Sequence, residues 1–362
     1  MYSAELDTAP SPEAELLLEC IRQAFGKGAP ERAAALAERV DRAAFESLAE
    51  AHGLAPLVSQ PAFRENARRV LVLTGELCRV VRLLESEGIA ALALKGTVLA
   101  HLVYRDPAHR IFTDLDILVK PEQFEAALRV LSRDGYRVPG SNYLREERRV
   151  FGAASGELHL QHAERRIWID LHRSLSPSNF PQPLTTREAF ERARIVDLNG
   201  QPVTTLSSAD TLLHLCVHGT QHYWASLSMI ADVCGAIQAA PTTDYTELFG
   251  RARRSGTERM LSFGLAAAGC LMRGGAGTQT ESWLRRIAAS QKNGSGTARE
   301  LWLQVRLIAG HKRRLSYLWS RVLTPQEPDW LSLRLPHRAL FFLYYPWRIL
   351  RLAWRWIYLG LR

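Results

Sequence analysis

The chain has 362 residues, of which 47% are hydrophobic and 23% are charged. This composition is typical of a protein with folded cores, and it excludes a disordered or collagen-like chain. The net charge of +9 is unevenly distributed, because residues 1–250 contain 26 basic and 32 acidic residues whereas residues 251–362 contain 20 and 5. The basic part predicts a contact with an anionic membrane or another polyanion, and the absence of a groove-reading motif argues against sequence-specific binding of nucleic acid.

The sequence gives no signal for membrane insertion or secretion. No stretch reaches the roughly 18 consecutive apolar residues that a membrane-spanning helix needs. The N-terminus is acidic and polar, unlike a secretory signal. The five cysteines are scattered and contain no C-x-x-C pair, which fits a reducing compartment. We therefore expect a cytoplasmic protein.

Hydrophobic periodicity divides the chain into four parts, taken in order. Residues 1–85 are expected to form helices, because apolar residues recur at helical spacing from residue 12 onward. Residues 86–205 alternate short apolar runs with helical patterns in the order strand, helix, strand, helix, strand, strand, and then a hairpin turning at Asn199-Gly200. Residues 206–290 are helical again, and residues 291–362 form a basic helical tail. The predicted fold class is α+β, with a small mixed sheet between helical regions.

The strand predicted over 113–119, TDLDILV, carries an unusual pair of acids. Asp114 and Asp116 are two residues apart, so both side chains should lie on one face of the strand. Two neighbouring carboxylates repel each other unless a cation lies between them, and oxygen ligands favour Mg²⁺ or Mn²⁺. A strand whose acids simply face water is the alternative interpretation.

Two further features make the pair more specific. Upstream, Lys95, Gly96 and Thr97 form a turn between a strand and a helix, where backbone amides at a helix N-terminus could receive phosphate oxygens. Downstream, Asp170 lies within a hydrophobic strand, where an uncompensated carboxylate would be costly. A structural ion pair with a nearby arginine is the alternative for Asp170.

In these motifs the chain resembles the DNA polymerase β-type nucleotidyltransferase superfamily, and more closely a bacterial family of uncharacterised nucleotidyltransferases. The matching segments are Leu94-Lys95-Gly96, Arg110 to Val119, Asp170-Leu171-His172, and His218 to His222, within roughly residues 85–240. Thr97 is a departure, because the superfamily usually has Gly or Ser there.

The resemblance implies a function and roles for the acids. Asp114 and Asp116 would hold two Mg²⁺ ions that bridge a nucleoside triphosphate, and Asp170 would bind the catalytic ion and help to deprotonate an acceptor hydroxyl. A nucleoside monophosphate would pass to a small molecule, sugar or peptide, and pyrophosphate would be released. Lys95 or Arg110 could neutralise phosphate oxygens, although either could equally be a solvated surface charge.

Histidines form a second set of candidate residues. His172 is expected on the same strand face as Asp170, where it could orient that carboxylate, touch substrate, or be an ordinary half-buried histidine. His214, His218 and His222 recur every four residues and so share one helix face. A zinc protease motif needs a Glu directly after the first His of such a pair, and neither His214 nor His218 is followed by one. We expect this helix to line the substrate cleft with His218 or His222.

Asp232 is an isolated acid in an apolar helix, and we expect it to pair with one of these histidines. The alternative for all of these groups is a set of satisfied polar residues in a helical core.

Residues 338–362 combine aromatic and basic residues at helical spacing. Arginines at positions 348, 351, 355 and 362 would form a stripe beside an apolar flank that includes Trp347, Leu350 and Trp354. Such a helix suits a membrane interface at the inner face of the cytoplasmic membrane. Alternatively, it packs on the protein or a partner subunit with its arginine stripe in water. A non-catalytic, membrane-associated or partner-binding module that keeps the fold is therefore the rival to the enzyme interpretation.

Overall fold

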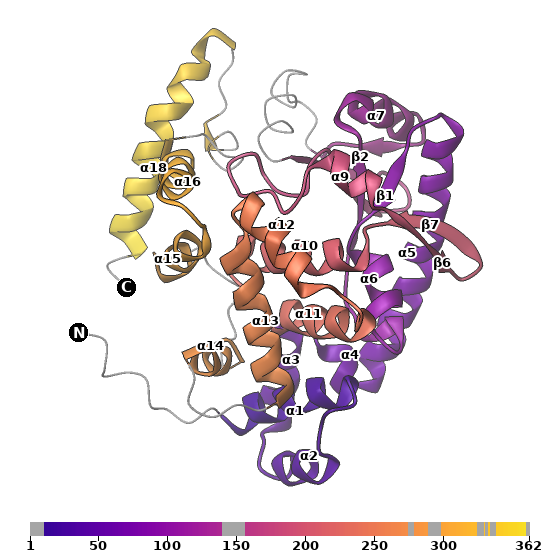
Figure 1. The fold of residues 1–362 in the computed structure, drawn as a ribbon, viewed down its shortest axis with the longest axis vertical. Helices are drawn as coiled ribbons and strands as arrows, with labels where there is room; N and C mark the ends of the chain where they lie inside the picture. Colours follow the sequence, from indigo (N-terminus) through magenta and orange to yellow (C-terminus); the bar gives the residue numbers. More distant parts are fainter. Residues whose placement is uncertain are drawn as a thin grey trace.

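The structure is a computed structural model that describes residues 11–139, 156–273, 279–288, 298–323, 329, 332–333 and 338–359. It has a mixed α+β fold in which one sheet lies beside a large helical body (Figure 1). This agrees with the fold class expected from the sequence.

Five helices precede the sheet, as the periodicity of the first 85 residues predicts. They are α1 (Pro12–Ala24), α2 (Pro30–Ala37), α3 (Arg42–Ala51), α4 (Ala55–Val58) and α5 (Gln60–Ser86). Apolar residues of α1 and α3 share one core with helices from the second half of the chain, so the two helical regions pack together although the sheet separates them in sequence.

The sheet has seven strands in the order β3-β4-β5-β2-β1-β7-β6. The strands are β1 (Ala91–Ala93), β2 (Asp114–Val119), β3 (Tyr136–Arg137), β4 (Glu157–His162), β5 (Trp168–His172), β6 (Arg194–Leu198) and β7 (Gln201–Thr205). Strand β2 pairs in parallel with β5 and antiparallel with β1. The expected hairpin joins β6 to β7, and Asn199 and Gly200 both have the positive φ that this turn requires.

Short helical elements connect these strands. They are α6 (Gly96–Val103), η1 (Pro107–His109), η2 (Pro121–Gln123), α7 (Phe124–Arg133) and α9 (Thr186–Glu191). One face of the sheet packs its aliphatic residues against α5, α6 and α7. Because side chains alternate along a strand, Leu115 and Ile117 belong to this core while Asp114 and Asp116 point to the opposite face.

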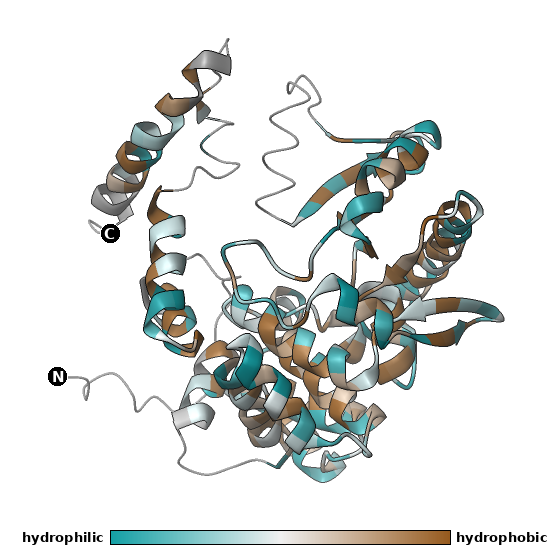
Figure 2. Cartoon of the chain, turned by 45° about the horizontal axis from the view of Figure 1, so that its top comes forward, coloured by the Kyte–Doolittle hydropathy of each residue, from teal (hydrophilic) through white to brown (hydrophobic). Residues whose placement is uncertain are grey.

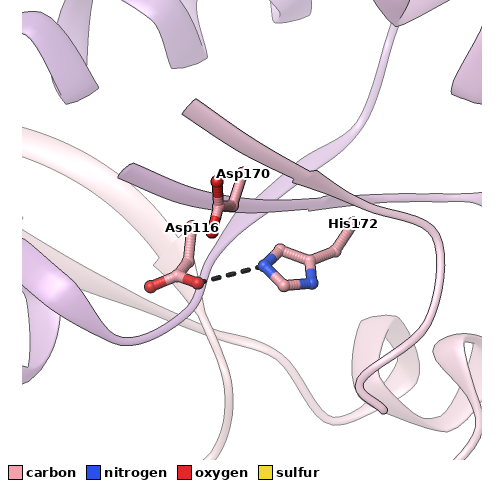
Figure 3. Close-up of side chains that lie close together, drawn as sticks. All are labelled: Asp116, Asp170 and His172. Atoms are coloured by element: carbon pink, nitrogen blue, oxygen red, sulfur yellow. Dashed lines mark hydrogen bonds and ion pairs between the residues drawn. The ribbon is translucent and has the colours of Figure 1, made fainter. Parts of the chain in front are cut away.

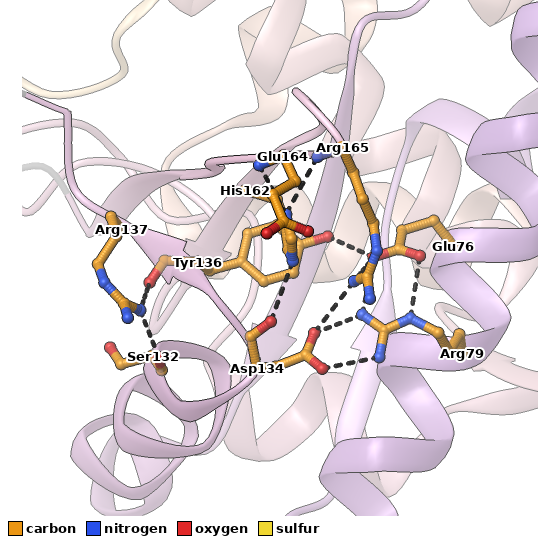
Figure 4. Close-up of polar contacts among 9 residues, drawn as sticks. All are labelled: Glu76, Arg79, Ser132, Asp134, Tyr136, Arg137, His162, Glu164 and Arg165. Atoms are coloured by element: carbon orange, nitrogen blue, oxygen red, sulfur yellow. Dashed lines mark hydrogen bonds and ion pairs between the residues drawn. The ribbon is translucent and has the colours of Figure 1, made fainter.

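A polar network fixes the edge of the sheet to α5 (Figure 4). The carboxylate of Glu76 accepts hydrogen bonds from Arg79, from the hydroxyl of Tyr136 at 2.7 Å and from Arg165 at 3.0 Å. Arg79 also binds Asp134, which follows α7. Three elements that are distant in sequence are thereby tied together beside the sheet.

The helices that follow the sheet complete the helical body. They are α10 (Ser208–Gln221), α11 (Leu227–Ala239), α12 (Tyr245–Ser255), α13 (Glu258–Arg273), α14 (Gln279–Ala288), α15 (Ala298–Leu307), α16 (His311–Leu323), η3 (Arg338–Leu343) and α18 (Tyr344–Leu359). None of the helices in the described residues is long and apolar enough to cross a membrane.

The C-terminal helix α18 contacts α16, and apolar and polar residues alternate along it (Figure 2). Two arginines of its stripe, Arg348 and Arg351, do not lie free in water, as one of the two sequence interpretations required, and the side chains of Arg355 and Arg362 lie outside the described part of the chain. Arg348 is only 3% exposed, and it binds Asp329 at 2.6 Å; Arg351 binds the same carboxylate at 2.5 Å. The exposure expected for these two arginines is wrong, because Asp329, which lies outside the helix, provides a buried counter-charge for both. The contact with α16 agrees with the packing on the protein that the same interpretation expected.

Candidate metal and nucleotide site

The acids predicted from the sequence meet on one face of the sheet because of strand register. Asp116 on β2 lies directly opposite Asp170 on β5, and Asp114 is one pleat away on the same face. All three line a cavity of about 430 Å³, which we call the carboxylate cavity. Leu94 and Leu118 belong to a small apolar cluster on this side of the sheet.

Asp116 lies at the centre of a chain of charged contacts. Its Oδ1 is 3.0 Å from the Lys95 ammonium and 3.0 Å from Nε2 of His172. The other ring nitrogen of His172 lies 3.1 Å from a carboxylate oxygen of Glu157, on β4. Although burial alone would raise it, the positive charge of Lys95 and the hydrogen bond from His172 hold the pKa of Asp116 far below its usual range.

The pKa values of three neighbouring groups, Asp114, Lys95 and His172, are all raised. Burial and the negative charges of Asp116 and Asp170 raise the pKa of Asp114 to about 6. Burial disfavours the charged forms of Lys95 and His172, yet the adjacent Asp116 carboxylate raises the pKa of both. The crowded carboxylates therefore attract cations, which is the electrostatic condition for a divalent-metal site.

One group of side chains could share a metal ion among the described residues. Ligand atoms of Asp116, Asp170 and His172 all lie within 4.8 Å of one another (Figure 3). The predicted trio of Asp114, Asp116 and Asp170 thus lines one cavity, but the tightest cluster contains His172 in place of Asp114. His172 also contacts Asp116 and not Asp170, the carboxylate that the sequence suggested.

Two residues of the site were missed by sequence reasoning. Nδ1 of His159 is 2.6 Å from Oδ1 of Asp170, and Glu157 contacts His172. Both belong to β4, which pairs antiparallel with β5, so their side chains share the face of Asp170. The polar alternation in ELHLQH was the available signal, since Glu157 and His159 are two residues apart on a predicted strand.

The turn before α6 forms one wall of the cavity. Lys95 and Gly96 line it, whereas Thr97 is 2% exposed and lies behind them. Gly96 has φ +43°, and an added Cβ would lie 3.2 Å from the carbonyl oxygen of Asp114. Glycine therefore allows the close approach of this turn to β2 without the strain that a side chain would add.

Arg110 lines the cavity, but its guanidinium is paired with Asp232, which is not a lining residue. Its Nε and Nη2 each donate to the carboxylate of Asp232 at 2.9 Å, and its Nη1 donates to the carbonyl of Gly96 at 3.3 Å. The hydroxyl of Tyr104 donates to the same carboxylate at 2.8 Å. The expected pairing of Asp232 with a histidine is therefore wrong, because the arginine fork and the phenol occupy that carboxylate.

The opposite wall of the cavity comes from α10 and from His222, which follows its last residue. His214, His218 and His222 line it in a row, with successive ring centroids 5.9 and 4.3 Å apart. Burial and the nearby Lys95 charge lower the pKa of His214 to about 3 and that of His222 to about 4, so these imidazoles are neutral. They are not part of the metal-ligand cluster found in the described residues.

Residues 33–273 match the family model described as an uncharacterised nucleotidyltransferase. The chain belongs to this family. The matched region extends beyond the segment whose motifs suggested it, into the N-terminal helices and through α13.

An antigenic nucleotidyltransferase-like protein from Paracoccidioides brasiliensis has 15% sequence identity with the chain, and the match covers 54% of this chain and 92% of that protein. Its TM-score of 0.32 is too low to support an argument from shared structure. No curated protein matches the chain.

Proposed function

We propose that this member of the nucleotidyltransferase family transfers a nucleoside monophosphate from a nucleoside triphosphate to a hydroxyl-bearing acceptor. The observation that carries the proposal is the convergence of Asp114, Asp116 and Asp170 in one cavity, beside Lys95 and the N-terminus of α6. A structural ion pair needs one carboxylate for each cation, whereas four carboxylates, Asp114, Asp116, Glu157 and Asp170, line this cavity.

The donor set fits Mg²⁺ or Mn²⁺. Asp116 and Asp170 would hold the ion, with Asp114 beside them, because hard divalent cations prefer carboxylate oxygens. The ion would supply positive charge that stabilises the phosphate oxygens during displacement. Burial and the negative charges of Asp116 and Asp170 raise the pKa of Asp114 to about 6, and a cation bound nearby would favour its charged form.

The residues of the chain would position the reactants and move a proton. The acceptor oxygen would form a bond to the α-phosphorus, while the bond from that phosphorus to the bridging oxygen breaks and its electron pair leaves with pyrophosphate. Asp170, oriented by His159, would receive the acceptor proton. Lys95 would contact phosphate oxygens, and Arg110 would support the turn at Gly96.

The α10 wall would contact the nucleotide or the acceptor. His218 and His222 are neutral and line the cavity, so each can donate one hydrogen bond and accept another. Asp232 would act on the substrate only through Arg110, which it positions.

The test compares single Asn replacements of Asp114, Asp116 and Asp170 with the wild type. Isothermal titration with Mg²⁺ and each of the four nucleoside triphosphates should show binding by the wild type and loss of it in the variants. Incorporation of labelled nucleotide into a cell extract should follow the same order. Glu125→Gln, on the exposed surface of α7, is the matched control and should behave as wild type. A wild type that binds no nucleotide at millimolar concentration would leave the non-catalytic module as the better interpretation.

A second proposal concerns the C-terminal helices, which we infer contact the inner face of an anionic membrane as a peripheral surface. Trp319 on α16 is 71% exposed, and Leu350 and Trp354 on α18 are 63% and 64% exposed. These apolar side chains lie in the part of the chain with 20 basic and 5 acidic residues. Exposed aromatic residues beside excess positive charge suit an anionic membrane interface.

Liposome co-sedimentation tests this surface directly. The wild type should bind vesicles that contain anionic lipid, and simultaneous replacement of Trp319, Leu350 and Trp354 with serine should abolish binding. Ile195→Ser is the matched control, because Ile195 is 72% exposed on β6 at a distance in the fold. Equal binding by the triple variant would refute the membrane contact and leave a protein partner as the occupant.

A further inference from the structure

A second cavity, of about 550 Å³, also borders α10. Four arginines line it, at positions 192, 251, 254 and 313, and we call it the arginine cavity. Asp210 and Leu213 of α10 line the arginine cavity, whereas His214 and His218 line the carboxylate cavity. The two cavities thus share a helix but no lining residue.

The charge of the arginine cavity is not balanced by its own acids. Asp210 is fully buried, and it binds Arg251 at 2.7 Å and Arg192 at 2.9 Å. Glu188, the other acid in the lining, caps α9 through its hydrogen bonds with Thr185. Four arginines therefore face two carboxylates, which leaves an excess of two positive charges.

The excess charge resides on Arg254 and Arg313. Neither forms an ion pair or a side-chain hydrogen bond with any other described residue, whereas Arg253 next in sequence pairs with Glu258. The Arg313 guanidinium lies over Gly256, at a place where any Cβ would collide with it. Gly256 also has the positive φ that ends α12, so the turn both stops the helix and makes room for Arg313.

The rest of the lining suits a ligand with both polar and apolar parts. The hydroxyl of Ser316 can donate a hydrogen bond beside the arginines, while Phe180 and Leu184 provide an apolar wall. Arginine forks bind phosphate and carboxylate groups through paired hydrogen bonds, and a partly enclosed cavity strengthens those bonds. We propose that the arginine cavity binds a phosphate- or carboxylate-bearing ligand, independently of the nucleotidyl-transfer site.

The test titrates the full-length protein with inorganic phosphate, pyrophosphate and citrate at constant ionic strength, in metal-free buffer so that metal-dependent binding is suppressed. The variant Arg254→Gln/Arg313→Gln should weaken binding at least tenfold with an unchanged melting temperature, since both arginines are exposed. Arg253→Gln, on the same helix and 71% exposed, should bind as the wild type does. Preference for pyrophosphate or for citrate identifies the phosphate or the carboxylate as the recognised group.

A second variant separates this site from the proposed active site. Asp116→Asn/Asp170→Asn should retain anion binding, whatever its effect on nucleotide transfer. The proposal is overturned if the wild type binds none of the three anions at about 10 mM, if the double arginine variant binds them equally well, or if binding depends on Asp116 and Asp170.

Discussion

Replacing Asp232 with alanine is expected to destabilise the protein by about 3–5 kcal/mol, the usual cost of breaking a buried ion pair. Two geometric facts place this pair in that range. The side chains of Arg110 and Asp232 are 13% and 8% exposed, and two hydrogen bonds of 2.9 Å join them. The variant would leave a nearly buried guanidinium without its counter-charge and the hydroxyl of Tyr104 without its acceptor.

Urea unfolding followed by circular dichroism gives the measurement. Glu191→Ala removes an ion pair with Arg187 whose side chains are 53% and 87% exposed, and it should cost no more than about 1 kcal/mol. Adding Arg110→Met to Asp232→Ala should recover part of the lost stability, because the unpaired charge is then gone. If Asp232→Ala costs no more than Glu191→Ala, the pair does not anchor α11 to the turn at Gly96, and the reasoning fails.

Three further changes test other parts of the structure. Gly96→Ala should lower the free energy of unfolding by about 1–3 kcal/mol and weaken Mg²⁺–nucleotide binding, because φ is +43° and the new Cβ meets the carbonyl of Asp114. Gly88→Ala is the control: φ is +71° there but the space around the new Cβ is open, so this variant should show only the conformational cost. Although burial alone would raise it, hydrogen bonds from Arg79 and Tyr136 lower the pKa of Glu76 from 4.5 to about 2. The contribution of the Glu76 carboxylate to stability is therefore complete above pH 4.5 and is lost as the pH falls toward 2. Glu76→Gln should therefore reduce the drop in melting temperature between about pH 5 and about pH 3, and an unchanged drop would contradict this assignment. His214→Leu should leave the melting temperature equal or raise it, because both ring nitrogens are buried without a hydrogen bond in the described residues. A decrease of more than about 2 kcal/mol in the free energy of unfolding would show that His214 has an unrecognised partner.

Local sequence patterns were sufficient for most elements of the fold. The alternation in TDLDILV predicted β2 with Asp114 and Asp116 on one face, and Asn199-Gly200 predicted the hairpin of β6 and β7. Such signals are readable because a strand repeats every two residues and a tight turn needs a positive φ. The helices before and after the sheet followed from periodicity in the same way, but the common core of α1 and α13 did not, since periodicity marks a buried face without naming its partner.

The main errors in the sequence-based predictions concerned which groups the charged side chains bind. Asp232 was expected beside a histidine and instead binds Arg110, 122 residues away in the chain. Arg348 was assigned to an arginine stripe that one interpretation placed in water, and it is buried against Asp329. In both cases a carboxylate from another element decides the outcome, and no local pattern reports which element will pack there.

The sequence by itself identified candidate site residues. Residue type makes Asp114, Asp116 and Asp170 acids, and alternation along a strand places each of them on a strand face. Only the tertiary structure decided their neighbours. The parallel pairing of β2 with β5 sets Asp116 against Asp170, and the antiparallel pairing of β4 with β5 adds Glu157 and His159 to the same face. The physical reason is that register between strands depends on how the whole sheet packs against its helices, whereas alternation within a strand depends on the backbone alone.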